Sequence, residues 1–329
     1  MSSSAHVAHN ITPRNLWLID LAPRVESIQR EVIQGLSQTR KQLPPKLFYD
    51  HRGAELFNAI CATPAYYPTR TENEILRHAA PEIAQSVGEG ASIIEFGAGE
   101  MEKIRLLLPS LHPSIYAGID ISRDQLLRTS ASLAIDYPWL SVLAVVGDYY
   151  SELEAELKLP AEVRRIVFFP GSTIGNFEPG QAREFLHRVR ALVGSEGGLL
   201  IGVDLQKPVD ILTLAYNDPE GQTAAFNLNV LTRLNRELGA DFDLSAFAHE
   251  AIYNSHSNRI EMHLRSLRAQ QVGIAEHVFA FARNETIHTE SSYKYTPESF
   301  TSLARDAGFS ASRMWSDPDR FFGVFFVHN

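Results

Sequence analysis

Apolar side chains near the start of the chain recur every three or four positions, which is the period of one face of an α-helix. The pattern predicts helices over residues 24–39, 53–60 and 71–86, all ahead of the first strand-like segment. Residues 1–17 are polar over most of their length, and we expect them to form a frayed tail.

Strand-like runs of apolar and β-branched residues then alternate with helix-like segments. Parallel strands need long crossover connections, usually helices, so this alternation predicts a parallel sheet covered on both faces. Right-handed crossovers make it a doubly wound, Rossmann-like α/β sheet. The predicted strands are residues 92–96, 115–119, 141–146, 165–169 and 199–203, and the predicted helices between them are residues 101–108, 122–135, 151–157 and 181–192.

The alternation stops after residue 203 and returns only near the C-terminus. We infer that the stretch between is an insertion, which joins the N-terminal helices to form a second, discontinuous α+β domain over the carboxyl edge of the sheet. The second domain would comprise residues 18–71 and 210–296, and the sheet domain residues 72–209 and 297–329. Within the insertion the pattern predicts helices at 209–216 and 222–238 and strands at 248–253, 259–267 and 277–281; a helix at 297–307 and strands at 310–315 and 321–327 follow it.

Charge and composition exclude several classes of protein. The chain has 329 residues with 30 Lys+Arg and 39 Asp+Glu, a net charge of −9, and scattered basic residues, so nucleic acid is not an expected partner. No apolar stretch approaches the roughly 20 residues of a membrane span. The single cysteine, Cys61, allows no internal disulfide. We expect a cytoplasmic monomer that binds a small molecule and holds no metal.

A glycine-rich turn follows the first predicted strand, in the segment Glu95-Phe-Gly97-Ala-Gly99. Ligands of doubly wound sheets bind at this edge, where glycines let a nucleotide approach the backbone. A dinucleotide fingerprint requires a third glycine at position 102, but this chain has Glu102, which would repel a pyrophosphate. The turn therefore favours a ligand with a nucleoside and a positive centre but no phosphate, such as S-adenosylmethionine.

Acidic residues end the next two predicted strands. Asp120 lies 21 residues beyond Gly99, where its carboxylate can accept hydrogen bonds from both ribose hydroxyls. Asp148 could accept from an adenine amino group while Tyr149 packs beside the ring. Together with the glycine turn, these residues predict a nucleoside site.

Five longer motifs are not explained by the fold. They are Lys46-Leu-Phe-Tyr49-Asp50, Tyr66-Tyr67-Pro68-Thr69-Arg70-Thr71-Glu72, Pro170-Gly171-Ser172-Thr173-Ile174-Gly175-Asn176-Phe177, Ala215-Tyr216-Asn217-Asp218 and Thr289-Glu290-Ser291-Ser292. With these motifs in this order, the chain resembles the histidine-specific methyltransferase family that makes hercynine in ergothioneine biosynthesis. The resemblance extends from about residue 43 to the C-terminus.

The resemblance implies a class I methyltransferase domain, a substrate domain and S-adenosylmethionine as the methyl donor. It assigns the cofactor to Tyr49, Gly97, Lys103, Asp120, Asp148 and Tyr149. Lys103 falls in the first turn of the helix after the glycine loop, where it could pair with the carboxylate of the cofactor. Without the resemblance, this residue is expected to be a solvated helix lysine.

The resemblance also implies an amino-acid site. Glu290 and Ser292 are two residues apart on one strand, so they share a face and could bind the two imidazole nitrogens, while Met262 packs against the ring. Amide and hydroxyl groups at Tyr66, Asn176 and Tyr216 are expected to act in catalysis by holding a neutral amine. The full expected substrate set is Tyr66, Gly171, Asn176, Tyr216, Met262, Glu290 and Ser292.

The expected reaction is trimethylation of the α-amino group of L-histidine, where the number of methyl groups comes from the resemblance alone. Three other interpretations stay open. The same fold could methylate tryptophan or an indole, because Glu290 and Met262 alone distinguish an imidazole pocket from one for a larger ring. The chain could instead be a nicotinamide-dependent dehydrogenase, which Glu102 disfavours, or a non-catalytic binding protein that retains the nucleoside pocket.

Overall fold

The computed structural model describes residues 9–11, 13–21, 25–147, 157, 159–160 and 163–329. Asp148, Tyr149 and most of the helix predicted at residues 151–157 lie outside the described residues. No helix in the described ranges is both long enough and apolar enough to cross a membrane.

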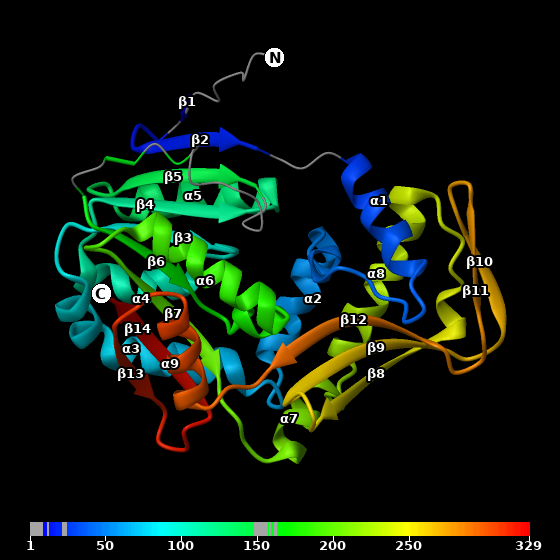
Figure 1. Cartoon of the computed structure of the whole chain (residues 1–329). Helices are drawn as coiled ribbons and strands as arrows, with labels where there is room; N and C mark the ends of the chain where they lie inside the picture. The colour runs from blue at the N-terminus through cyan, green and yellow to red at the C-terminus, as the bar shows by residue number, and fades with distance from the viewer. Residues whose placement is uncertain (1–8, 12, 22–24, 148–156, 158, 161–162) are drawn as a thin grey trace.

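A nine-stranded sheet occupies the left-hand part of Figure 1, with strand order β1-β2-β5-β4-β3-β6-β7-β14-β13. The six strands from β2 to β7 in that order are mutually parallel, whereas β1, β14 and β13 pair antiparallel with their neighbours. The predicted doubly wound α/β fold is therefore confirmed. The strands are β1 (His9–Ile11), β2 (Leu16–Asp20), β3 (Ser92–Phe96), β4 (Ile115–Asp120), β5 (Ser141–Val146), β6 (Arg165–Phe169), β7 (Gly198–Asp204), β13 (Ala311–Ser316) and β14 (Phe322–His328).

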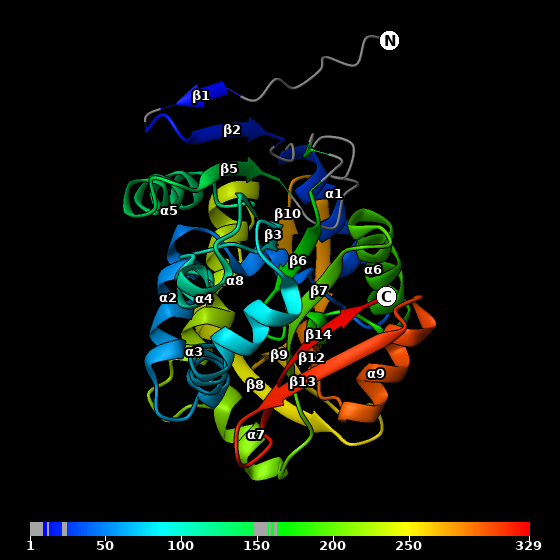
Figure 2. The same cartoon turned by 90° about the vertical axis from the view of Figure 1, so that its left-hand side faces the viewer.

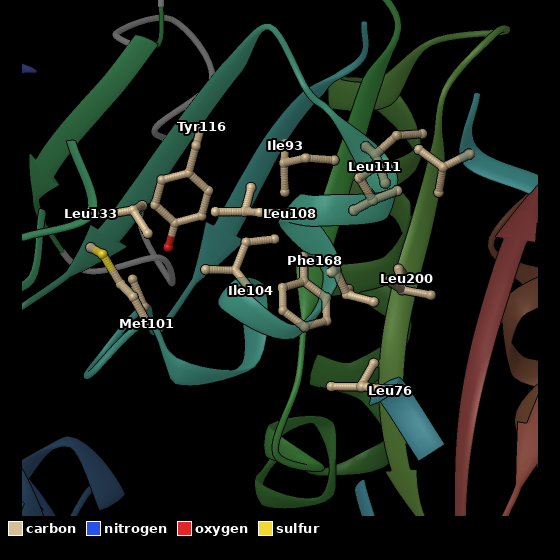
Figure 3. Close-up of a cluster of buried hydrophobic side chains, with 14 of the residues drawn as sticks. Leu76, Ile93, Met101, Ile104, Leu108, Leu111, Tyr116, Leu133, Phe168 and Leu200 are labelled. Carbon is tan, nitrogen blue, oxygen red and sulfur yellow. The ribbon is translucent and has the colours of Figure 1, made fainter. Parts of the chain in front are cut away.

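Successive strand residues enter two separate hydrophobic clusters, one on each face of the sheet. Ile93 packs with the helices on one face, and its neighbour Ile94 packs with the helices on the other. Figure 2 shows these helices on opposite sides of the sheet, and Figure 3 shows the first cluster. The first face is covered by α3 (Tyr67–Val87), α4 (Glu102–Leu111) and α5 (Arg123–Asp136), and the second by α6 (Pro179–Val193) and α9 (Pro297–Asp306).

The N-terminal segment differs from the prediction of a frayed tail. Residues 9–11 and 16–20 form the strands β1 and β2. β2 pairs in parallel with β5, so that Leu16 to Asp20 lie opposite Val142 to Val146. Leu16 is fully buried on one face of the sheet, and Ile19 is buried on the other. This alternation of buried side chains places residues 18–20 in the central sheet, so the boundary predicted at residue 18 was wrong.

A separate hydrophobic core joins helices from near the N-terminus to the inserted region. Residues between Val32 and Tyr67 pack in it with residues between Leu212 and Ile287. The strand β10, which the periodicity missed, pairs with β11 in a hairpin. The elements are α1 (Val25–Leu36), η1 (Pro45–Phe48), α2 (His51–Ala62), α7 (Val209–Tyr216), α8 (Gln222–Leu238), η3 (Leu244–Ala246), β8 (Phe247–Asn254), β9 (Arg259–Ser266), β10 (Gln270–Ile274), β11 (His277–Phe281) and β12 (Thr286–Tyr293).

Candidate active site

A cavity of about 630 Å³ lies where the loops after β3, β4 and β6 meet the inserted region. Its wall includes the glycine turn and Asp120 from the sheet, and side chains from α2, α7, β9 and β12. All the site residues expected from the sequence that the structure describes line this one cavity. They are Tyr49, Tyr66, Gly97, Lys103, Asp120, Gly171, Asn176, Tyr216, Met262, Glu290 and Ser292.

The glycine turn holds its shape because two of its residues adopt positive φ angles, +71° at Gly97 and +49° at Gly99. It is tied to β4 through Asp120, whose carboxylate accepts from the backbone N–H of Gly99 at 3.0 Å and of Ser122 at 2.8 Å. Burial raises the pKa of Asp120, and these backbone hydrogen bonds oppose the shift. The carboxylate is thus fixed in orientation, with acceptor capacity left for a ligand hydroxyl.

Lys103 is paired within the protein, which the sequence did not reveal. Its ammonium lies 2.5 Å from Oε2 of Glu72, a carboxylate whose side chain is 1% exposed. The same carboxylate accepts from the backbone N–H of Gly171 at 2.9 Å. Glu72 therefore links the lysine expected to hold the cofactor to the loop expected to hold the substrate. The sequence signal that could have pointed to Glu72 is its position as the last residue of the Tyr66–Glu72 motif.

Aromatic side chains form the wall between α2 and α7. The rings of Tyr66 and Tyr216 meet edge to face with centroids 6.2 Å apart, and Tyr49 meets Phe57 in the same manner at 5.9 Å. Burial raises the pKa of Tyr66 well above its ordinary value and also raises that of Tyr216. Both hydroxyls therefore stay protonated near neutrality and act as hydrogen-bonding groups.

Asn176 comes next to Glu290 because η2 (Thr173–Asn176) packs against β12. A Cβ atom added at Gly175 would lie 2.9 Å from the carbonyl oxygen of Tyr293, so this approach requires glycine. The amide Nδ2 of Asn176 donates to Oε2 of Glu290 at 3.4 Å. This bond directs the amide nitrogen towards the carboxylate and leaves Oδ1 as an acceptor.

Glu290 and Ser292 line the cavity from the same face of β12, and Met262 is opposite Glu290 on β9. Burial raises the pKa of Glu290 to about 7, although the nearby Lys294 ammonium opposes the shift. Ser292 accepts a hydrogen bond from the hydroxyl of Tyr216 at 2.8 Å. A carboxyl and a hydroxyl thus stand side by side next to an apolar side chain. Across the described ranges, no group of three or more His, Cys, Asp or Glu side chains is arranged to hold a metal ion.

The fold and the site together define a class of enzyme. Among the described residues, a parallel sheet carries a glycine turn, an acidic residue at the end of the next strand, and Glu102 where a dinucleotide fingerprint has its third glycine. This combination is typical of S-adenosylmethionine-dependent methyltransferases. A profile of the family described as "Histidine-specific methyltransferase, SAM-dependent" matches residues 28–329. The chain belongs to this family.

Curated relatives agree with the family. The chain is 41% identical over 305 residues to the Histidine N-alpha-methyltransferase of Mycolicibacterium smegmatis, covering 91% of this chain and 94% of that protein. The protein of the same name from Mycobacterium tuberculosis is 40% identical over 304 residues, with the same coverage. Ergothioneine biosynthesis protein 1 of Neurospora crassa is 31% identical over 285 residues, which cover 84% of this chain and 32% of that protein.

The residues of the cavity fit S-adenosylmethionine. Asp120 offers a preorganised acceptor for ribose hydroxyls, and the backbone of the glycine turn is free of side chains at Gly97 and Gly99. Glu100 and Glu102 also line the cavity, and their carboxylates disfavour a phosphate while tolerating a positive centre.

Proposed function

We propose that this chain transfers three methyl groups in succession from S-adenosylmethionine to the α-amino nitrogen of L-histidine, giving hercynine, the first step of ergothioneine biosynthesis. The observation that carries the proposal is the meeting of two sets of residues in one cavity. The glycine turn and Asp120 form one side, and Glu290, Ser292 and Met262 form the other. Two relatives that are 41% and 40% identical to this chain carry the name Histidine N-alpha-methyltransferase, which supports the same substrate.

The imidazole ring of histidine matches the chemistry of the second set. An imidazole has two ring nitrogens, and in its neutral form one donates a hydrogen bond while the other accepts. Glu290 supplies an acceptor, Ser292 supplies a hydroxyl, and Met262 supplies an apolar wall. We therefore place the ring against β12, with the α-amino group extending towards Asn176.

Catalysis in this proposal consists mainly of positioning. When bound, S-adenosylmethionine would supply a methyl group on a sulfonium, and the neutral thioether S-adenosylhomocysteine would leave as the amine nitrogen bonds to the methyl carbon. The amine would release one proton to solvent in each of the three transfers. Oδ1 of Asn176 is free to accept from the amine because Nδ2 bonds to Glu290. Tyr66 and Tyr216 are protonated, so they orient the substrate and do not remove its proton. Orientation of this kind contributes roughly 7–11 kcal/mol to a bimolecular step.

Mass spectrometry of small-molecule products tests the proposal. The purified protein is incubated with S-adenosylmethionine and each of the twenty amino acids in separate reactions. We expect histidine to gain three methyl groups, with little reaction elsewhere. Methylation of another amino acid would overturn the histidine assignment. Tight binding of the methyl donor without any product would instead support the interpretation of the chain as a non-catalytic binding protein.

A paired substitution tests the ring pocket. Glu290→Ala combined with Met262→Val enlarges the pocket and removes its acceptor, so histidine turnover should fall and tryptophan should be admitted. The surface substitution Glu276→Gln, at the exposed turn between β10 and β11, serves as the control. If kcat and KM for histidine are unchanged in the double variant, neither Glu290 nor Met262 belongs to the histidine site.

A further inference from the structure

A cluster of buried charges adjoins the cavity, and one of its members, Asp204, lines it. Asp204, at the end of β7, is flanked by the ammonium groups of Lys207 and Lys294, and all three side chains are at most 1% exposed. Lys294 Nζ lies 2.7 Å from Asp204 Oδ2, and Lys207 Nζ lies 2.6 Å from Asp204 Oδ1. Burial disfavours the charged form of Lys294, but the Asp204 carboxylate outweighs it and raises the pKa of Lys294.

Lys294 differs from Lys207 in what else it contacts. Besides Asp204, its ammonium donates to Ser292 Oγ at 2.7 Å and to the hydroxyl oxygen of Tyr216 at 3.2 Å. These three contacts use all three N–H groups of the ammonium. Lys207 instead donates to the hydroxyl oxygen of Tyr67 at 2.7 Å and to a backbone carbonyl. Only Lys294 therefore bonds directly to hydroxyl groups that line the cavity.

The hydrogen bonds to Ser292 determine what its hydroxyl can do. Its oxygen accepts from Lys294 at 2.7 Å and from the hydroxyl of Tyr216 at 2.8 Å. A hydroxyl oxygen has two acceptor lone pairs, so both are occupied. The remaining capacity of Ser292 is to donate its own hydrogen, and the residue lines the cavity.

We propose that Lys294, held by Asp204, is a positioning residue that sets the Ser292 hydroxyl as a donor to an unprotonated ring nitrogen of the substrate. This inference rests on the proposed function and deepens it. Ser292 donates to the bare nitrogen while Glu290 accepts from the N–H, so the site takes the neutral imidazole. An indole ring carries an N–H but no bare nitrogen, so it leaves Ser292 without an acceptor. Lys294 thus contributes to the choice of histidine over tryptophan.

Two matched substitutions separate this role from a purely structural one. Lys294→Met and Lys207→Met each remove one buried ammonium from the same carboxylate, and each leaves Asp204 paired with the other lysine and with Tyr67. We expect Lys294→Met to raise KM for histidine by about tenfold or more, the equivalent of one charge-assisted hydrogen bond, with little change in the affinity for S-adenosylmethionine. Lys207→Met should leave KM for histidine close to the wild-type value.

A double-mutant cycle with Ser292→Ala shows whether Lys294 acts through that hydroxyl. In the Ser292→Ala background, Lys294→Met should have little further effect on KM for histidine. Additive effects, or equal effects of Lys294→Met and Lys207→Met, would overturn the inference while leaving the proposed function intact. A wild-type protein that does not methylate histidine would instead overturn the proposed function, and the inference with it.

Ring analogues test the same point on the unmodified protein, in case Lys294→Met does not fold. Thiazolylalanine has a bare ring nitrogen and no ring N–H, and phenylalanine has neither. The comparison therefore isolates the bond donated by Ser292. We expect thiazolylalanine to inhibit histidine methylation about tenfold more strongly than phenylalanine. Equal inhibition by the two would contradict a donating Ser292.

Discussion

Glu290→Gln should stabilise the ligand-free protein at alkaline pH while weakening the binding of histidine. Glu290 is 8% exposed, and burial raises its pKa from an ordinary value of 4.5 to about 7. Between these pH values, the folded protein holds a proton that the unfolded chain has already released. The free energy of unfolding of the wild type therefore falls as the pH rises through this window.

The size of the effect follows from the two pKa values. The interval between 4.5 and about 7 corresponds to a total of roughly 3 kcal/mol, most of which falls between pH 5 and pH 8. Glutamine carries no charge, so its contribution does not vary over this range. It also keeps an oxygen that can accept from Asn176 Nδ2. The stability of Glu290→Gln relative to the wild type should thus rise by about 2–3 kcal/mol from pH 5 to pH 8.

Urea unfolding of the wild type and of Glu290→Gln at pH 5 and pH 8, without ligands, measures this difference. The control is Glu276→Gln, whose exposed side chain stays in water in both the folded and the unfolded protein, and which should follow the wild type at both pH values. If the difference between Glu290→Gln and the wild type is the same at pH 5 and pH 8, the reasoning from burial is refuted. In a titration with histidine, the wild type should bind the ligand more tightly than Glu290→Gln does.

Two further substitutions test the cofactor side of the cavity. Asp120→Asn replaces a charged acceptor by an amide that cannot accept from both Gly99 and Ser122, so the affinity for S-adenosylmethionine should fall by about tenfold or more in titration calorimetry. An unchanged affinity would exclude Asp120 from the cofactor site. Glu72→Gln removes the buried charge beside Lys103 and should lower the free energy of unfolding by about 1.5–3 kcal/mol in urea, whereas a loss below about 0.5 kcal/mol would show that this pair contributes little.

The site residues were easier to predict from the sequence than the contacts between them. The glycine turn and Asp120 follow strands whose apolar runs are visible locally, so their meeting at one edge follows from a parallel sheet. Glu290 and Ser292 share a face because strand residues alternate. Glu72 stood in a recognisable motif, but its partner Lys103 is 31 residues away on another helix. Local periodicity does not show which helices become neighbours.

The sequence by itself determined the alternation of strands and helices, the glycine turn and the family motifs, because each depends on residues a few positions apart. Only the tertiary structure decided that residues 16–20 join the sheet, since their burial depends on β5 lying beside them. Only the tertiary structure, likewise, brought Lys294 to Asp204 across 90 positions. Burying a charge is costly unless it is paired or hydrogen-bonded, and the residue that follows β12, packed near the end of β7, supplies a partner of opposite charge.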